Sequence, residues 1–578
     1  MQHQFTKIAS LLAIILLSDL SLIAQTEKEL RIWSEQPDAI SSIRFPGSVR
    51  DSIELEKVTR ALKSELQSMG YLLTTIQVKE DSLYRELKIY PGTRYQLAYL
   101  SPGNLPEIVQ SRVGYRERFY RSTPFNYKEI KKLFNRIIEY GENNGYPFAS
   151  VQMDSVKIEN GRFSGVVNYD PGPLISYDSL NLRGNLRIKP QYLSAYLQIK
   201  PGTVYSERKS ARIEQRLASL NYLKVNSAVG TSFQNSMATH YLDLQHQAIN
   251  QIDGIIGFLP NEREGNKLLV TGEFNLSLNN LFQTGKAIRM EWRSLRPESQ
   301  YLHVRYDHPF IFRTPIGLNF DFDLLKEDSA FLNRNFRIEA DYIPGIYSKI
   351  RFFTEFKNSG LLSSDSNPEE SLLLADFDIT TYGLGYSLNT TRNLIFPRSG
   401  WKLDTEVYLG NKTIRKNSNI DESFYDSLDL KSTQFYFTFI AQKFFQSGKR
   451  SVAGIKGSFG KIQNDQLFLN DLFRPGGLQS LRGFNERNFF ASDYVILTAE
   501  WRYLMDKSSY FFIFYDQGFL SYDLNEASYK DQPSGIGVGL SLSSKAGIFN
   551  LVYALGRTQE QPFAFNLSKI HFGYISRF

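Results

Sequence analysis

The stretch VILTAEWRY, residues 495–503, decides the fold of the second half of this chain. Its apolar and aromatic residues alternate with Thr498, Glu500 and Arg502. Successive side chains of a β-strand point to opposite faces, so one face is apolar and the other carries charge. Charges that faced a dry core would be costly, whereas a water-filled interior accepts them. The stretch therefore predicts a strand of a barrel with an apolar outside and a wet lumen.

The same period of two continues from about Asn250 to the C-terminus and forms sixteen runs. An even number of antiparallel strands closes a barrel without leaving a backbone edge in lipid. The last run alternates Ile570, Phe572 and Tyr574 and ends on Phe578, an arrangement typical of the export signal of outer-membrane barrels. We therefore predict a 16-stranded transmembrane barrel over residues 249–578. The runs begin near Ile252, Lys267, Lys286, Gln300, Ile316, Leu332, Tyr347, Phe377, Trp401, Ser432, Ser451, Asp493, Ser509, Gly535, Gly547 and Leu567.

The composition agrees with this class and excludes others. With 34 Tyr and 43 Phe among 578 residues, the chain is rich in aromatics although its mean hydropathy is mildly polar. Outward apolar and inward polar residues of a barrel average out in this way. The net charge of +7 is small for this length and forms no basic stripe, so no nucleic-acid partner is expected. The absence of cysteine excludes disulfides and thiol chemistry.

The N-terminus has the pattern of a secretory signal peptide. Lys7 precedes the apolar run Ile8 to Leu17, and Ala24 provides a small residue for cleavage. The apolar run is too short to span a bilayer as a helix, which requires about 20 residues. We therefore expect residues 1–24 to be removed on export.

A repeat fills the region between the signal peptide and the barrel. The dipeptide Gly-Tyr occurs at 70–71 and again at 145–146, and Asn-Tyr follows at 221–222. Each dipeptide follows an apolar stripe at helical spacing and precedes two short β runs. This predicts an α+β region of tandem β-α-β-β modules ahead of the all-β barrel. The predicted modules occupy residues 25–91, 92–172 and 173–248. Their helical stripes are core, and their open sheet edges suit strand addition by an extended peptide.

The long connection between Gly460 and Asp493 carries unusual chemistry for a surface loop. It contains Gly476-Gly477 and then Leu481-Arg482-Gly483-Phe484. A loop folded back into a lumen needs an anchor, and the planar guanidinium of Arg482 offers several donors to a carboxylate. Gly483 permits the tight turn that such an anchor requires. Glu500 has the lumenal parity and is a candidate acceptor.

With Phe514-Tyr515-Asp516-Gln517-Gly518, this loop resembles two motifs of the BamA/TamA family of outer-membrane assembly factors. Those motifs are an Arg-Gly-Phe/Tyr tip and an aromatic-x-Asp-x-Gly sequence two strands later. The resemblance implies an inward-pointing loop in which Asp516 accepts from Arg482, with Gly483, Phe484 and Gly518 completing the motifs. It also implies that the N-terminal modules are POTRA domains located in the periplasm.

The resemblance implies insertion of β-barrel proteins into the outer membrane, or translocation of polypeptides across it. The implied partners are unfolded outer-membrane or secreted polypeptides, outer-membrane lipid, and either an inner-membrane-anchored TamB-like protein or accessory lipoproteins. Three modules bring the layout nearer to TamA than to BamA. No phosphate-binding loop, nucleophile elbow or metal-ligand cluster occurs in the sequence, so we expect no enzyme, cofactor or metal.

Two alternatives remain open on sequence grounds. The first is a dedicated secretion pore of the two-partner type, which usually carries two POTRA modules behind a plug helix. The second belongs to another class, a passive porin or receptor barrel, which needs neither three N-terminal modules nor a paired Arg482 and Asp516.

Overall fold

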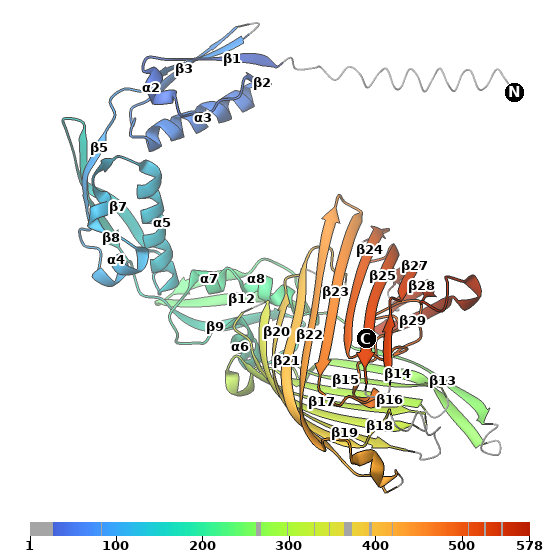
Figure 1. Cartoon of the computed structure of the whole chain (residues 1–578). Coiled ribbons are helices and arrows are strands. Elements are labelled where there is room, and N and C mark those ends of the chain that lie inside the picture. Colours follow the sequence, from blue (N-terminus) through green and yellow to red (C-terminus); the bar gives the residue numbers. More distant parts are fainter. Residues whose placement is uncertain are drawn as a thin grey trace, which may run out of the picture. The chain divides into compact units, whose positions relative to one another are not determined.

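The computed structural model describes residues 27–81, 84–261, 267–296, 299–328, 330–345, 347–362, 373–391, 396–418, 420–506, 508–524, 527–544 and 547–577. The expected signal peptide, residues 1–24, lies outside these ranges. The chain divides into two compact units. Figure 1 shows the elements in chain order. Among the described residues, no helix combines the length and apolarity needed to cross a membrane.

The first module is a four-stranded sheet with the order β2-β1-β4-β3, in which β1 and β4 are parallel. Its long helix α3 begins at an Asp51 cap, whose Oδ1 accepts from the Glu54 amide at 2.7 Å. The helix buries Leu55, Leu62 and Leu66 against the sheet. The elements are β1 (Lys28–Ser34), α2 (Pro37–Ile40), β2 (Ser48–Val49), α3 (Ser52–Ser68), β3 (Thr75–Glu80) and β4 (Tyr84–Tyr90).

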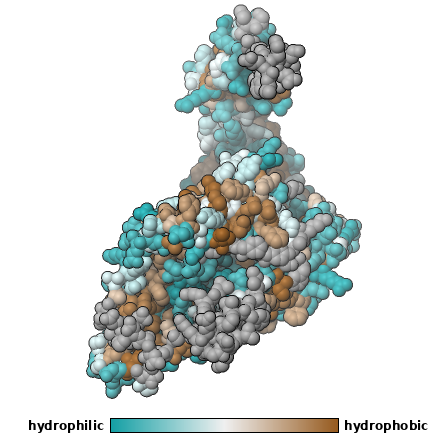
Figure 2. All heavy atoms as spheres, turned by 90° about the vertical axis from the view of Figure 1, so that its right-hand side faces the viewer, coloured by the Kyte–Doolittle hydropathy of each residue, from teal (hydrophilic) through white to brown (hydrophobic). Residues whose placement is uncertain are grey.

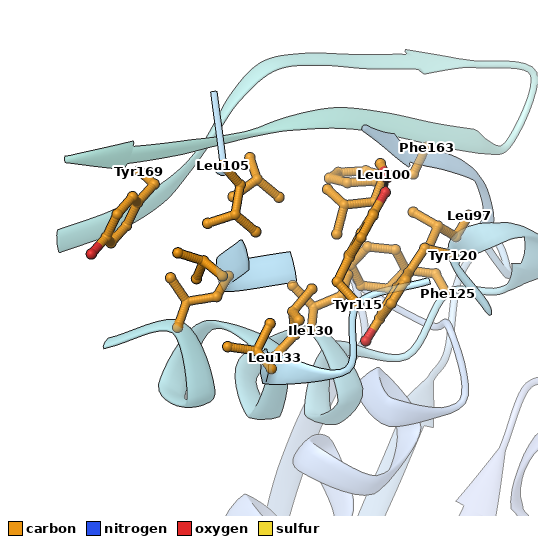
Figure 3. Packing of buried hydrophobic residues seen from close by; sticks show 14 residues of the cluster. Leu97, Leu100, Leu105, Tyr115, Tyr120, Phe125, Ile130, Leu133, Phe163 and Tyr169 are labelled. Carbon is orange, nitrogen blue, oxygen red and sulfur yellow. Dashed lines mark hydrogen bonds between the residues drawn. The ribbon is translucent and has the colours of Figure 1, made fainter. Parts of the chain in front are cut away.

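The second module repeats this plan with the order β6-β5-β8-β7. In its core the rings of Tyr115 and Tyr120 stack at 5.4 Å, and Phe125 meets Phe163 edge-on at 4.7 Å (Figure 3). The same buried cluster includes Val109 and Val113 of α4 and Leu133 and Ile137 of α5, which pack these helices against the sheet. The elements are β5 (Gln96–Ser101), α4 (Glu107–Val113), η1 (Glu117–Tyr120), β6 (Arg121–Pro124), α5 (Tyr127–Asn143), β7 (Ser150–Glu159) and β8 (Arg162–Asp170).

In the third module β12 pairs with β9, β10 and β11. The repeated dipeptides begin just after α3 and α5, where Gly70 and Gly145 have φ of 102° and 94°, values that favour glycine. The elements are β9 (Ser176–Gly184), α6 (Pro190–Leu197), α7 (Glu207–Ser210), α8 (Ile213–Ala218), β10 (Leu223–Val225), β11 (Gly230–Gln234) and β12 (Met237–His246).

The predicted β-α-β-β plan is confirmed, and each sheet has a fourth strand in addition. Each module also contains a short helix directly after its first strand, namely α2, α4 or α6. The sequence analysis missed these helices because their length is too small for a helical period to emerge. In α4, for example, only Val109 and Val113 are buried.

The barrel is confirmed as a closed antiparallel sheet in which sixteen strands follow one another in chain order. The short strand β26, which was not expected, pairs with the end of β25. Every expected strand start lies within two residues of the observed one. The strands are β13 (Gln251–Asn261), β14 (Lys267–Leu281), β15 (Lys286–Arg296), β16 (Ser299–His308), β17 (Ile316–Glu327), β18 (Phe331–Tyr342), β19 (Ser348–Leu361), β20 (Phe377–Asn389), β21 (Gly400–Ile414), β22 (Lys431–Ser447), β23 (Ser451–Gln463), β24 (Asp493–Leu504), β25 (Tyr510–Asp523), β26 (Ser528–Asp531), β27 (Ser534–Ser543), β28 (Gly547–Arg557) and β29 (Lys569–Arg577).

The alternation of side chains separates two faces of the barrel wall. In β25, Phe512, Phe514 and Asp516 are buried on the inner face, whereas Ile513 and Tyr515 are exposed on the outer face. Figure 2 shows apolar residues gathered in groups over the barrel. The outward apolar face is the surface that a bilayer requires.

The barrel closes at a short junction between its first and last strands. Within the described residues, β13 meets β29 only where Gln251 pairs with Arg577 and Ile252 pairs with Ser576. By contrast, β13 pairs with β14 along its whole length, from Gln251 to Asn261. We call this short ladder the seam. Most of the edge of β13 that faces β29 lacks a ladder partner within the described strands.

Candidate functional site: an arginine anchor inside the barrel

The connection between β23 and β24 folds back on itself as an ordered segment. Phe473 and Ala491 bridge its two limbs. Gly476, Gly477 and Gly483 have φ of 131°, 93° and 94°, which favours glycine at these turns. We call residues 464–492 the lumenal segment, and Arg482 lies at its tip.

Arg482 and Asp516 make three hydrogen bonds. The guanidinium donates from Nε to Asp516 Oδ2 at 2.8 Å and from Nη2 to Asp516 Oδ1 at 2.7 Å. The backbone amide of Arg482 donates to the same Oδ2 at 3.0 Å. Asp516 is fully buried and Arg482 is 8% exposed. A two-pronged contact of this kind fixes both the position and the orientation of the guanidinium.

Glu500 completes the charge balance around the arginine. Arg482 Nη1 donates to Glu500 Oε2 at 2.6 Å, and Arg502 Nε donates to Glu500 Oε1 at 2.7 Å. The carbon of the Arg482 guanidinium also lies 3.6 Å from the centre of the Phe514 ring. The sequence analysis placed Arg502 in the alternating strand and Phe514 in the second motif, but it assigned neither of them a contact with Arg482. Both side chains lie on the inner face of their strands, as Glu500 does. The alternation of inner and outer residues could therefore have identified them as neighbours of the arginine.

The backbone of the tip lies directly on the barrel wall. A β-carbon on Gly483 would come within 2.7 Å of the carbonyl oxygen of Leu555 in β28. A β-carbon on Gly556 would lie 2.5 Å from the carbonyl oxygen of Gly483. Glycine on both sides therefore allows an approach that side chains would block. The tip thus contacts β28, the strand before the one that forms the seam.

The other motif residues pack around this contact. Phe484 is buried and meets Phe489 edge-on at 4.9 Å, within an apolar cluster that includes Leu481 and Leu520. The amide of Gly518 donates to the carbonyl of Pro533 at 2.7 Å. The motif residues therefore lie together around one point of the wall. The buried charges are paired and hydrogen-bonded, as burial requires.

The structure describes only part of the expected C-terminal signal. The backbones of Phe572 and Tyr574 pair with Leu551 and Phe549 in β28, although their side chains are not described. Phe578 lies outside the described residues. Across the described ranges, no group of three or more His, Asp or Glu residues is placed to hold a metal ion.

Comparisons with known proteins agree with this architecture. The Omp85 superfamily domain model matches residues 271–571, and a POTRA model described as a surface antigen variable number repeat matches residues 175–242. None of the curated proteins matches the sequence.

Solved structures are similar at low sequence identity. CdiB from Escherichia coli is 13% identical with a TM-score of 0.54, and the match covers 94% of this chain and 100% of that one. CdiB from Acinetobacter baumannii is 11% identical with a TM-score of 0.53, covering 91% and 97%. BamA from Haemophilus ducreyi lacking POTRA domains 1–3 is 13% identical with a TM-score of 0.43, covering 83% and 98%. At these identities the two CdiB structures establish a shared fold.

POTRA modules ahead of a sixteen-stranded barrel with an inward arginine loop define a class of outer-membrane protein. The family model matches more than half of the chain, so the chain belongs to the Omp85 superfamily. The resemblance to this group of barrels is thereby confirmed. The specific TamA-like layout stays a prediction.

Proposed function

We propose that this protein is an outer-membrane assembly factor that inserts β-barrel proteins or translocates polypeptides across the outer membrane. Its POTRA modules lie in the periplasm and capture unfolded clients, and its barrel opens between β13 and β29. The observation that carries the proposal is the seam, where Gln251 with Arg577 and Ile252 with Ser576 form the ladder.

The seam supports this function for a physical reason. Unpaired backbone groups are very unfavourable in lipid, so an exposed strand edge is satisfied only by another strand. A short ladder costs little to break, and the edge of β13 then serves as a template for a client strand. The tip of the lumenal segment lies on β28, the strand that pairs with β29. Outer-membrane lipid surrounds the apolar outer face.

Client capture uses the open edge of the first module in this proposal. β3 is an edge strand whose register with β4 is continuous from Thr75 to Glu80. The corresponding edge strand of the second module, β7, is interrupted between Asp154 and Lys157, where Ser155 has φ of 49°. A bulge of this kind disrupts strand addition. The proposal therefore assigns extended polypeptides to β3.

No cofactor or enzymatic step is needed for this activity. A client strand gains backbone hydrogen bonds and apolar burial as it inserts, and this provides the driving free energy. The proposal therefore treats the protein as a non-enzymatic machine.

Depletion of the protein followed by quantitative outer-membrane proteomics tests the proposal. A broad fall in many unrelated barrels supports an assembly factor. Loss of one secreted protein with barrels intact would instead identify a dedicated secretion pore. Unchanged levels of both would contradict the proposal and favour a passive barrel.

A further inference from the structure

The lumenal segment takes part in another buried ion pair, which lies near its beginning rather than at its arginine tip. Lys412 on β21 pairs with Asp471, and both side chains are fully buried. Asp471 ends the short helix η5 (Leu469–Asp471) near the start of the lumenal segment. Neither residue belongs to the motifs that the sequence analysis identified. Burying two charges costs desolvation free energy, so a buried ion pair is weak evidence for stability. The presence of this pair between the wall and the lumenal segment therefore requires an explanation other than stability.

Each charge of this pair is held by further contacts. Lys412 Nζ also donates to the carbonyl of Gln466 at 3.0 Å and lies 4.6 Å from the centre of the Phe377 ring. Asp471 Oδ2 accepts from the amide of Phe468 at 3.0 Å. Phe377 and Phe468 belong to one buried apolar cluster. The pair is therefore enclosed by the barrel wall on one side and the lumenal segment on the other.

The neighbouring residue, Asn470, extends the attachment across the wall. Its side chain donates to Ser359 Oγ at 2.7 Å and to the carbonyl of Ala375 at 2.6 Å. Its own carbonyl accepts from Asn333 Nδ2 at 3.0 Å and from Lys357 Nζ at 3.2 Å. We call Asn470 and Asp471, with these contacts, the root. The root thus bonds to β18, β19 and β21.

The root and the tip attach the lumenal segment to different parts of the wall. The tip bonds to Glu500 on β24 and Asp516 on β25, and it lies against β27 and β28. The root strands, β18 to β21, do not overlap with these. A cavity of about 400 Å³ lies beside the root and is lined by Tyr408, Asn470 and Asp471 among others. The segment is therefore attached to the wall at its root and at its tip, and it also forms ion pairs from Arg474 to Glu327 on β17 and from Glu486 to Arg293 on β15.

We propose that Lys412 and Asp471 are positioning residues that retain the segment in the lumen when the Arg482 tip is released. Breaking the tip frees only the half of the segment that bears it, because the root keeps its own bonds. Loss of one root partner strands the other charge in a buried site and is strongly destabilising to the attachment. The pore therefore stays closed after release of the tip and opens only when the root is also lost.

Single-channel conductance of the purified full chain in planar lipid bilayers tests this proposal. The variants are Arg482→Ala, the root variant Lys412→Met/Asp471→Asn, and the combination of all three changes. Lys416 and Glu422 form an exposed pair at 2.8 Å on the connection after β21, so Lys416→Met/Glu422→Gln in the Arg482→Ala background is the matched control. Heat-dependent migration on gels verifies that each barrel is folded.

The expected result is near-native conductance for Arg482→Ala and for its control combination, and a several-fold increase for the combination with the root variant. Two results would overturn the proposal: full conductance from Arg482→Ala alone, or no further increase when the root is removed. Conductance does not depend on client assembly, so this outcome is independent of the proposed function.

A labelling measurement covers the case in which the combined variant does not fold. The chain contains no cysteine, so Gln479→Cys provides a unique thiol on the exposed part of the segment. In the Arg482→Ala background, a polyethylene-glycol maleimide too large for the lumen should label this thiol several-fold faster after Lys412→Met. Lys412→Arg, which retains the cation, should restore slow labelling. Equal labelling rates in all three backgrounds would contradict the proposal.

Discussion

The carbonyl oxygen of Arg482 lies directly against Gly535 of β27, where an added β-carbon would come within 2.0 Å of it. The contact joins backbone to backbone, so no flexible side chain can move away to make room. Together with the contact between Gly483 and β28, it places the tip of the lumenal segment on the two strands that precede β29. Glycine at position 535 is therefore required for the tip to lie this close to β27.

The change Gly535→Ala should displace the tip. Overpacking of this kind costs about 1–3 kcal/mol, so we expect a lower urea midpoint for unfolding in detergent. Gly457→Ala is the control, because a β-carbon there would meet only Leu497 Cδ2 at 3.7 Å. Equal unfolding midpoints for the two variants would show that the tip does not require this close approach.

Replacing Arg482 should lower the free energy of unfolding more than replacing an exposed arginine. Arg482→Ala leaves Asp516 buried without its main partner, a change worth about 3–5 kcal/mol. Arg415→Ala breaks a half-exposed pair with Asp378 and a hydrogen bond of 2.9 Å to the Ser359 carbonyl, and the loss of the exposed pair should cost only about 0–1 kcal/mol. Urea unfolding of both variants checks the difference. Similar losses for the two would refute the assignment of Arg482 as the anchor.

The period-two pattern predicted the barrel well because side-chain alternation responds directly to a lipid face and a wet lumen. The starts of β13 to β25 could be located from this pattern alone, and inward parity also identified Glu500. The motif resemblance then directed attention to Asp516 as the acceptor. These features depend on residues close together in sequence or on a regular period.

The root could not be predicted in the same way. Lys412 lies near the end of a strand and Asp471 lies in a connection, so each reads as an ordinary surface residue. Their contact joins positions far apart in the chain and depends on where the lumenal segment folds back. The helices α2, α4 and α6 were missed for a different reason, since tertiary packing rather than a long apolar period stabilises them.

The capping of α3 provides a test of the first module. Asp51→Ala removes the hydrogen bond of 2.7 Å that the Glu54 amide donates to Asp51 Oδ1, and loss of such a cap costs about 0.5–2 kcal/mol. Hydrogen exchange of the α3 amides in the full chain should quicken accordingly. Asn126→Ala in α5 removes a longer bond of 3.3 Å and should have a smaller effect on that helix. The reverse order would contradict this account of the caps.

Client contacts should concentrate on β3. Val78 in β3 and Val156 in β7 are both 48% exposed on edge strands, so they form a matched pair for a photo-crosslinking residue. We expect a translocating polypeptide to crosslink at position 78 and weakly at position 156, because the bulge interrupts β7. Equal crosslinking at the two positions would contradict the assignment of clients to β3 rather than β7.

Opening of the seam is the central claim, and a reversible lock tests it most directly. Cysteines replacing Gln251 and Arg577 would join β13 to β29, whereas cysteines replacing Gln251 and Ser277 would join β13 to β14. The measurement is insertion of a client barrel into liposomes that contain the purified protein. We predict that oxidation of the first variant abolishes insertion, that reduction restores it, and that the second variant is unaffected. Undiminished insertion by the fully oxidised seam variant would contradict the account.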